Sequence, residues 1–397
     1  MIDAIVAGHL CIDIIPRFLP HTPGAPEALL APGRLVEVGD AVVSTGGAVS
    51  NTGLSLARLG LDVRLVARLG DDLIGGLTRR VVERSGAHLG RGLTTAHGEP
   101  SSYTIVISPP GVDRIFLHCP GTNNTFGPED VDDALLAGAR LFHFGYPPIM
   151  RRMYADGGAE LEALLSRAAR LGTTTSLDLS LPDAASASGR ADWPGILART
   201  LPHVRVFTPS AEELLFMLDR PAYEGALRSP GGPVDAFTPD MIAALADRAL
   251  AMGARVVGLK LGHRGLYLRT AASLGDMGRG TPADPEAWTG REAWAPCFSA
   301  AVASTVGSGD ATIAGLLAAL LRGQGPLAAM TTAVAVGACN VEAADATSGV
   351  RTWEETQERV RAGWPRLGVG ALGDAWRWDA AAGVWLGPRD TGGQAPA

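Results

Sequence analysis

Residues 304–310 combine a glycine-rich turn with a carboxylate, a pattern that favours phosphoryl transfer. The sequence Ser-Thr-Val-Gly-Ser-Gly-Asp runs directly into an alanine- and leucine-rich stretch over residues 311–321, which predicts a helix. The N–H groups of Gly307, Ser308 and Gly309 would stand at the helix N-terminus, where they lack intrahelical partners and the helix dipole favours anions. Asp310, in the first turn, could accept the proton of an attacking hydroxyl. The alternative is a tight turn whose carboxylate only complements the helix dipole.

A second glycine turn lies near the N-terminus. Gly46 and Gly47 precede a segment that begins at Asn51 and carries apolar residues at helical spacing, so a helix is expected over residues 51–59. Asp13 lies shortly after a first predicted strand over residues 2–7. A carboxylate beyond the carboxyl end of a parallel strand is well placed to bind a polyol, because ligands bind at those ends in open α/β sheets.

Taken together, these motifs give the chain a resemblance to a known family. From about residue 2 to about residue 356 it resembles the ribokinase-like carbohydrate kinases, also called the phosphofructokinase-B (PfkB) family. The resemblance rests on the order and spacing of short motifs: GHLCID at 8–13, GGAVSN at 46–51, LGDDLIG at 69–75, GTN at 121–123, TPSAEE at 208–213, LGHRG at 261–265 and GSGD at 307–310.

The resemblance implies a three-layer α/β/α sandwich with a mainly parallel sheet and a small β-sheet lid over the sugar. The kinase domain is expected over residues 1–365, with lid segments at about 15–46 and 97–122, and residues 366–397 are expected to form a partly disordered C-terminal extension. Alternating strand and helix patterns independently favour βαβ units. Strands are predicted at 2–7, 63–69, 141–144, 173–179, 204–208 and 255–261, helices at 51–59, 72–85, 128–137, 158–171, 210–218, 239–252, 310–321 and 326–343, and lid strands at 35–43, 101–108 and 114–119.

The resemblance also implies which residues hold the acceptor. Asp13 matches the acidic residue that hydrogen-bonds substrate hydroxyls, and Gly46 and Gly47 allow close backbone approach beside Asn51, which can both donate and accept. Two further candidates stay open between two interpretations. Gly145 either faces the substrate or ends a strand, and Arg114 either reaches an acidic or phosphorylated substrate or is an ordinary charge at a hairpin tip.

On the nucleotide side, Glu213 matches the family residue that acts on ATP-bound Mg²⁺, often through water. Gly262 and Gly265 match the turn beneath the nucleotide. Lys260 stands where the family commonly has Thr, so it either pairs with a phosphate or ends an exposed strand. Asn340 either contacts adenine or serves as a polar packing residue.

Two other departures from the family pattern concern ions. Ser210 replaces an Asn that usually lies three residues before Glu213, which leaves the Mg²⁺ network open. Ser304 replaces an Asp that in some members helps to order a monovalent-cation site, so potassium dependence stays open.

Composition sets independent limits. The 397 residues are 46% hydrophobic and 19% charged, enough for a large core, and a net charge of −7 without a basic cluster argues against a nucleic-acid partner. The four cysteines show no CxxC pair and favour neither a zinc site nor a disulfide framework. Residues 1–8 lack a secretory signal and the apolar runs are too short to cross a membrane, so a cytoplasmic location is expected. In the tail, GVGALG at 368–373 lacks the strand and helix of a dinucleotide site, a hairpin is expected over 375–386, and residues 387–397 are expected to be disordered.

The sequence therefore predicts an ATP- and Mg²⁺-dependent kinase that phosphorylates a hydroxyl, expected to be a hydroxymethyl, of a small sugar or sugar-like molecule. Asp310 would be the base, and the 307–309 amides would form the anion hole. Two alternatives stay open: a nucleoside kinase, for which Phe116, Phe126, Phe142, Phe144 and Tyr146 could stack a base, and a sugar-binding regulatory protein with weak catalysis. Family members often dimerise through lid edges, so a homodimer is also expected.

Overall fold

A single large sheet forms the centre of the molecule. The computed structural model describes residues 1–19, 29, 31–109 and 115–392. The sheet contains β1 (Ile2–Gly8), β4 (Val63–Gly70), β5 (Leu93–Ala96), β8 (Ala139–Gly145), β9 (Thr174–Leu177), β10 (Val206–Phe207), β11 (Val256–Lys260), β12 (Leu266–Thr270), β13 (Glu292–Ala295), β14 (Arg377–Asp379) and β15 (Val384–Leu386). Its order is β14-β15-β13-β12-β11-β10-β9-β8-β1-β4-β5. All neighbouring pairs from β11 to β5 are parallel, and those from β11 to β14 are antiparallel.

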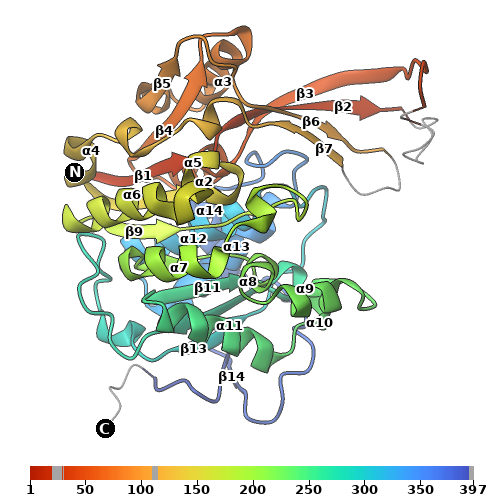
Figure 1. Ribbon diagram of the computed structural model, residues 1–397. Coiled ribbons are helices and arrows are strands. Elements are labelled where there is room, and N and C mark those ends of the chain that lie inside the picture. The colour runs from red at the N-terminus through yellow and green to blue at the C-terminus, as the bar shows by residue number, and fades with distance from the viewer. Residues whose placement is uncertain (20–28, 30, 110–114, 393–397) are drawn as a thin grey trace.

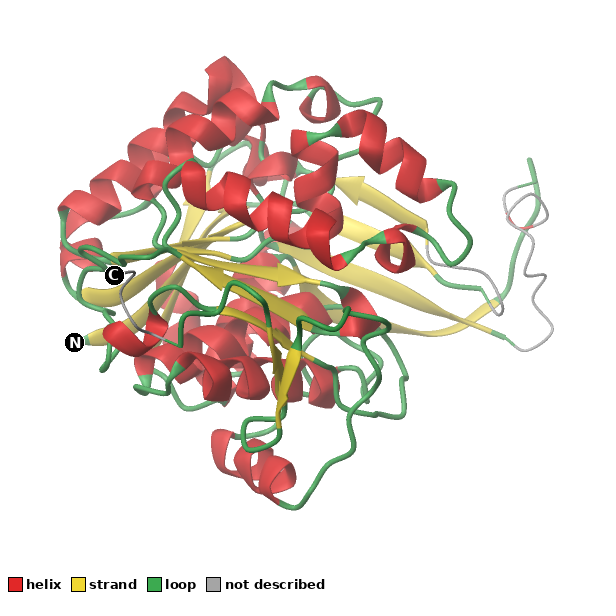
Figure 2. Cartoon of the chain, turned by 90° about the horizontal axis from the view of Figure 1, so that it is seen from below, coloured by secondary structure: helices red, strands yellow, loops and turns green. Residues whose placement is uncertain are grey.

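Helices cover both faces of this sheet, so the predicted three-layer sandwich is confirmed (Figure 2). One apolar core is contributed by α4 (Asp133–Ala137), α5 (Arg151–Tyr154), α6 (Ala159–Arg170), α7 (Trp193–Thr200), α8 (Ala211–Leu218), α9 (Arg220–Leu227), α10 (Pro233–Ala236) and α11 (Pro239–Ala251). The other is contributed by α2 (Ala48–Arg58), α3 (Leu73–Arg84), α12 (Ser308–Leu321), α13 (Pro326–Asn340) and α14 (Trp353–Arg361). Within the described ranges, none of these helices has the length and apolarity needed to cross a membrane.

A separate four-stranded sheet forms the lid. Its strands are β2 (Cys11–Phe18), β3 (Val38–Gly46), β6 (Tyr103–Ile107) and β7 (Ile115–Cys119), in the order β3-β2-β6-β7. Figure 1 shows them projecting from the body of the molecule. We did not predict β2, because Pro16 interrupts the strand signal; the register of β2 against β3 shifts between Pro16 and Phe18. Exposed apolar side chains on β3 and β7 include Val42 and Phe116, while the homodimer through the lid stays a prediction.

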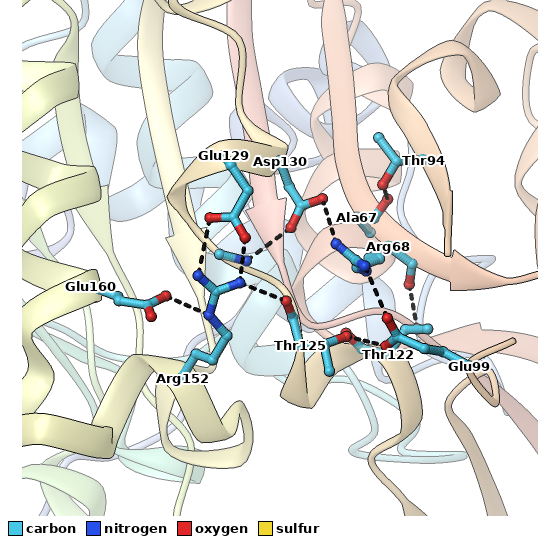
Figure 3. Close-up of polar contacts among 11 residues, drawn as sticks. Ala67, Arg68, Thr94, Glu99, Thr122, Thr125, Glu129, Asp130, Arg152 and Glu160 are labelled. Carbon is cyan, nitrogen blue, oxygen red and sulfur yellow. Dashed lines mark hydrogen bonds and ion pairs between the residues drawn. The ribbon is translucent and has the colours of Figure 1, made fainter. Parts of the chain in front are cut away.

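A polar network fixes the base of the lid to the body (Figure 3). Arg68 at the end of β4 pairs with Glu99 at 2.9 Å and with Asp130 at 3.3 Å, and its carbonyl accepts the Thr122 hydroxyl at 2.6 Å. Arg152 of α5 pairs with Glu129, with Glu160 of α6 at 2.6 Å, and donates to the Thr125 carbonyl at 2.9 Å. The network ties the residues on either side of β6 and β7 to the parallel sheet.

Several predicted element boundaries were wrong, each for a local reason. The expected helix at 128–137 divides, because Val131 is extended and the Asp132 side chain caps a new helix, α4, by accepting the Ala134 N–H. The expected loop after Arg220 contains α9, which is capped by Asp219 and has a proline in its first turn. The antiparallel strands β12 and β13 were also not predicted.

The C-terminal segment completes the large sheet. Strands β14 and β15 form the expected hairpin, and β15 pairs with β13. Trp376 lies in an aromatic cluster with Tyr267 and Trp294, at centroid distances of 6.3 and 6.0 Å. Residues 387–392 are not disordered as expected, because Asp390 forms a buried ion pair with Arg291 and Thr391 hydrogen-bonds to Gly290; residues 393–397 lie outside the described residues.

We predict that Asp390→Asn destabilises the protein. Asp390 accepts a hydrogen bond from Arg291 Nε at 2.6 Å, and the side chains of Asp390 and Arg291 are only 2% and 9% exposed. The variant therefore leaves a buried guanidinium without its counter-charge. The free energy of unfolding, measured by urea denaturation, should fall by about 3 kcal/mol. Asp374→Asn, at an exposed position of the same tail, is the control. Equal unfolding midpoints for Asp390→Asn and wild type would contradict the prediction.

Candidate active site

The glycine turn begins α12, as the sequence predicts. Gly307 is the N-cap residue and has a left-handed backbone, with φ of 70°; a Cβ there would lie 2.5 Å from the carbonyl oxygen of Ala346. Only glycine fits both constraints. The N–H of Ser308 points back to the carbonyl of Thr305 at 3.3 Å, which leaves it less available to a ligand than the N–H of Gly309 in the same turn.

Asp310, in the first turn of α12, is 3% exposed and is surrounded by donors from other elements. Asn51 Nδ2 of α2 donates to Oδ2 at 2.9 Å, and Thr52 Oγ1 lies 3.5 Å from Oδ1. The Tyr146 hydroxyl, just after β8, lies 2.9 and 2.8 Å from the two carboxylate oxygens. Burial raises the pKa of Asp310, although its hydrogen bonds with Asn51 and Tyr146 oppose that rise. The result is a fixed carboxylate of enhanced basicity.

A buried ion pair faces the same region from the sheet. Lys260 Nζ at the end of β11 lies 2.5 Å from Asp178 Oδ1, just beyond β9. Burial would lower the pKa of Lys260, but the charges of Asp178 and Glu213 raise it, so the amine is protonated. The side chain of Lys260 lies next to Gly309: a Cβ built at Gly309 would be 3.4 Å from the Cδ of Lys260. A cation therefore lies beside the predicted anion hole.

Two adjoining cavities share Lys260, Gly262 and Gly309. The first, of about 280 Å³, has mixed polar and apolar walls that include four charged side chains, and is lined by Tyr146, Ser210, Glu212, Glu213, Val234, Phe237, Lys260, Leu261, Gly262, Gly307, Gly309 and Asp310. The second, of about 240 Å³, is mostly apolar and includes Gly265, Phe298, Val302, Val334 and Val341. A cavity with charged side chains in its wall, next to a mostly apolar one, suits a phosphate chain joined to a flat aromatic base.

Glu213 and Ser210 form a capping box at the start of α8. The Ser210 N–H donates to Glu213 Oε2 at 2.7 Å, and the Glu213 N–H donates to Ser210 Oγ at 3.0 Å. The local role of Glu213 as a helix cap and its place in the wall of the first cavity are thus compatible. An oriented carboxylate beside a phosphate-sized cavity is the donor type that Mg²⁺ prefers, so the residues present fit that ion.

The predicted acceptor residues gather where the lid meets α2. Asp13 of β2 lies against Gly46 of β3, where a Cβ would fall 2.2 Å from Asp13 Oδ2, and Gly47 caps α2. Asn51 lies one turn inside α2 and contacts Asp310, which joins this group to the start of α12. Burial raises the pKa of Asp13, opposed by hydrogen bonds from Cys11 and Thr104.

Two other predicted site residues, Gly145 and Asn340, support the elements that form the site. At Gly145 a Cβ would fall 2.1 Å from Ala48 Cβ, so this glycine lets α2 pack against β8. Asn340 does not line either cavity; it is fully buried and donates from Nδ2 to the Val306 carbonyl at 2.9 Å, which supports the glycine turn from behind. Arg114 lies outside the described residues. Ser304, whose Oγ accepts the Val306 N–H at 3.2 Å, braces the same turn.

Other residues of the site were missed from the sequence. Asp178 lies near the carboxyl end of the strand predicted at 173–179, a position that could have marked it. Tyr146 carried no signal beyond its aromatic ring. His9, in the link between β1 and β2, and His118 of β7 approach each other at the lid base, with their Nε2 atoms 3.3 Å apart and Cys11 nearby. No spacing rule connects residues so far apart in the chain.

Comparisons with known proteins agree with the fold. A family model described as "pfkB family carbohydrate kinase" matches residues 1–353. A fructokinase with bound ATP from Xylella fastidiosa is 19% identical with a TM-score of 0.68, covering 90% of this chain and 98% of its own. A ribokinase complexed with ribose and ATP from Arabidopsis thaliana is 17% identical with a TM-score of 0.66, covering 90% and 98%. A protein from E. coli solved with ATP and Mg²⁺ is 17% identical with a TM-score of 0.65, covering 91% and 100%.

We predict that His143, buried beneath the site on β8, makes the fold sensitive to acid. Burial, and then the charge of Lys260, lowers the pKa of His143 to about 3. Because an unfolded histidine binds a proton near pH 6.5, the unfolded state gains protons first as pH falls, and stability decreases below that pH. Between pH 6.5 and 5 this histidine should account for a loss of about 1.5 kcal/mol, so the decrease in stability should be smaller by that amount in His143→Asn. His9 and His118, whose pKa values burial also lowers, still contribute in that variant.

Urea unfolding at both pH values would measure this loss. His88→Asn, at an exposed position, is the control and should behave like wild type. An unchanged pH dependence in His143→Asn would show that other groups cause it.

Proposed function

Because the chain belongs to the pfkB family of carbohydrate kinases, we propose that it transfers the γ-phosphoryl group of ATP to a hydroxyl of a small sugar or sugar-like molecule, with a hydroxymethyl group as the expected acceptor. The observation that carries this proposal is the position of Asp310. Its carboxylate lies in the wall of the first cavity and also contacts Asn51, beside the predicted acceptor residues. One side can hold phosphate and the other a polyol.

In this proposal Asp310 takes the proton of the acceptor hydroxyl as its oxygen attacks phosphorus. Burial supports that role, since it raises the pKa of the carboxyl towards a value at which proton acceptance is favourable. The amides of 307–309 and the dipole of α12 stabilise charge on the phosphoryl oxygens, with Gly309 the best placed. Asn51 fixes the carboxylate through its 2.9 Å hydrogen bond, while Asp13 and Gly47 hold the acceptor.

The nucleotide would occupy both cavities. Lys260 adds positive charge beside the phosphates, and because its amine is already paired with Asp178 it is held in place rather than free to follow the ligand. Gly262 lines both cavities and Gly265 lines the second, where a Cβ at Gly265 would lie 2.0 Å from the carbonyl oxygen of Ala295. Mg²⁺ would be held through Glu213, with water between, and when bound it supplies neutralisation of phosphate charge.

A sugar is favoured over a nucleoside as the acceptor. Phe126, Phe142 and Phe144 are fully buried in the apolar core, and Phe116 is on the lid, 55% exposed. Of the five aromatic residues that could have stacked a base, Tyr146 lines the first cavity with its hydroxyl bonded to Asp310, and three are enclosed in the core. Those three rings offer no open face on which a base could stack.

We predict acceptor-dependent ATP consumption. The purified protein, with ATP and Mg²⁺, should turn over with at least one of the pentoses, hexoses, keto-deoxy acids, inositols and nucleosides in a panel, assayed with and without potassium. A sugar should give the highest rate. The sugar-phosphate product should be identified by mass spectrometry, and a nucleoside as the best acceptor would contradict the preference argued above.

We predict that Asp310→Asn lowers kcat by a factor of about 10² to 10⁴, because a general base contributes on that order. The affinity for ATP, measured by calorimetry, should change little, since the substitution keeps the shape of the side chain. Glu212→Gln removes another carboxylate from the wall of the same cavity and should retain most of the activity. A loss of less than about tenfold in Asp310→Asn would exclude Asp310 as the base.

A further inference from the structure

The hydroxyl of Tyr146 occupies the place that an acceptor hydroxyl must take. It lies 2.9 Å from Oδ1 and 2.8 Å from Oδ2 of Asp310, so one phenol spans both oxygens of the carboxylate. A general base has to be within hydrogen-bond reach of the proton that it removes. With Asn51 and Thr52 on the same carboxylate, the phenol fills the approach from the site.

The position of the ring places it between the two substrates. Tyr146 lines the first cavity together with Glu213, Lys260 and Asp310. On its other side the ring centroid is 6.2 Å from that of His9, which is in turn 5.1 Å from His118 on the lid strand β7. An acceptor that enters between the lid and Asp310 therefore meets the phenol before it meets the carboxylate.

The backbone holds Tyr146 in a conformation that tyrosine rarely adopts. Its φ of 68° and ψ of 41° are left-handed, and in the described part of the chain Asp156 is the one other residue besides the glycines with positive φ. Such a conformation persists where the surroundings impose it, and it is concentrated at functional sites. Gly145 and Pro147 flank the residue, so the backbone on both sides is specialised as well.

The phenol is a donor and stays one. Burial, and then the charge of Asp310, raises the pKa of Tyr146 well above its usual value. The contact is therefore a hydrogen bond from a neutral hydroxyl to a carboxylate, which is the same contact that a sugar hydroxyl makes with a general base.

We propose that Tyr146 is a specificity-determining residue whose phenol substitutes for the acceptor hydroxyl until the acceptor displaces it. The inference rests on the proposed role of Asp310 as the base. While the phenol is in place, water cannot give its proton to Asp310 and attack the γ-phosphorus, so ATP is not hydrolysed to ADP and phosphate. A polyol that makes further contacts with Asp13 and Gly47 displaces the phenol, and water alone does not.

The test is ATP hydrolysis with Mg²⁺ and no acceptor. Tyr146→Phe keeps the ring and removes the hydroxyl, and we expect hydrolysis to rise by about 10- to 100-fold, the range that a hydrogen bond to a charged group can contribute. Tyr146→Gly suits the left-handed backbone and also removes the ring, so it should give at least the same rise. Tyr154→Phe, at a half-buried tyrosine of α5, is the matched control and should match wild type.

Each further outcome decides one question. Hydrolysis that stays at the wild-type rate in both Tyr146 variants overturns the inference, and so does a rise that persists when Asp310→Asn is added to Tyr146→Phe. Phosphotyrosine at position 146 in wild type after incubation with ATP, detected by mass spectrometry, also overturns it, because the phenol would then be an acceptor itself. A different result would show that Asp310 is not the general base: the single variant Asp310→Asn would then phosphorylate the sugar at the normal rate.

Discussion

The site is organised by the need to keep one carboxylate charged inside the protein. Asp310 is almost fully buried, and an ionised carboxylate without partners would be very costly there. Its partners come from α2 and from the turn after β8, and Asp310 itself lies in the first turn of α12, so these three elements must meet at one point. Lys260 adds a compensating charge from β11 but is itself paired with Asp178. The packing of one helical layer against the sheet therefore serves a single electrostatic requirement.

Close backbone approach is the second condition for this convergence. Gly145 brings the start of α2 against β8, and Gly315 in α12 would place a Cβ 2.8 Å from the Cα of Ala333 in α13. Gly46 leaves space for the carboxylate of Asp13. Side chains at these positions would separate elements whose contacts bring the base, the acceptor residues and the nucleotide cavities together. The glycines thus allow the elements to pack closely, and this close packing brings the polar side chains within contact distance of one another.

Local sequence patterns, together with the family resemblance, predicted the fold and the place of Asp310 in it, because the relevant signals are short-range. A glycine turn before an apolar run placed Asp310 at the start of α12, and alternating strand and helix signals gave the parallel sheet. Contacts that depend on tertiary packing were not accessible. Tyr146 reaches Asp310 across 164 positions of the chain, and Asn340, placed near adenine by resemblance, instead supports the Val306 carbonyl. Strand β2 was hidden by Pro16, and β12 and β13 are short strands that depend on neighbours for their pairing.

The order of strands in the large sheet has a consequence for synthesis of the chain. All the parallel strands, from β1 to β11, have been synthesised once the chain reaches Lys260. In contrast, β13 acquires its outer neighbour only when β15, at Val384–Leu386, has been made. Until then a row of unpaired N–H and C=O groups on β13 is open to any extended segment nearby. The nascent kinase thus passes through an aggregation-prone interval late in translation, and the last two strands end it.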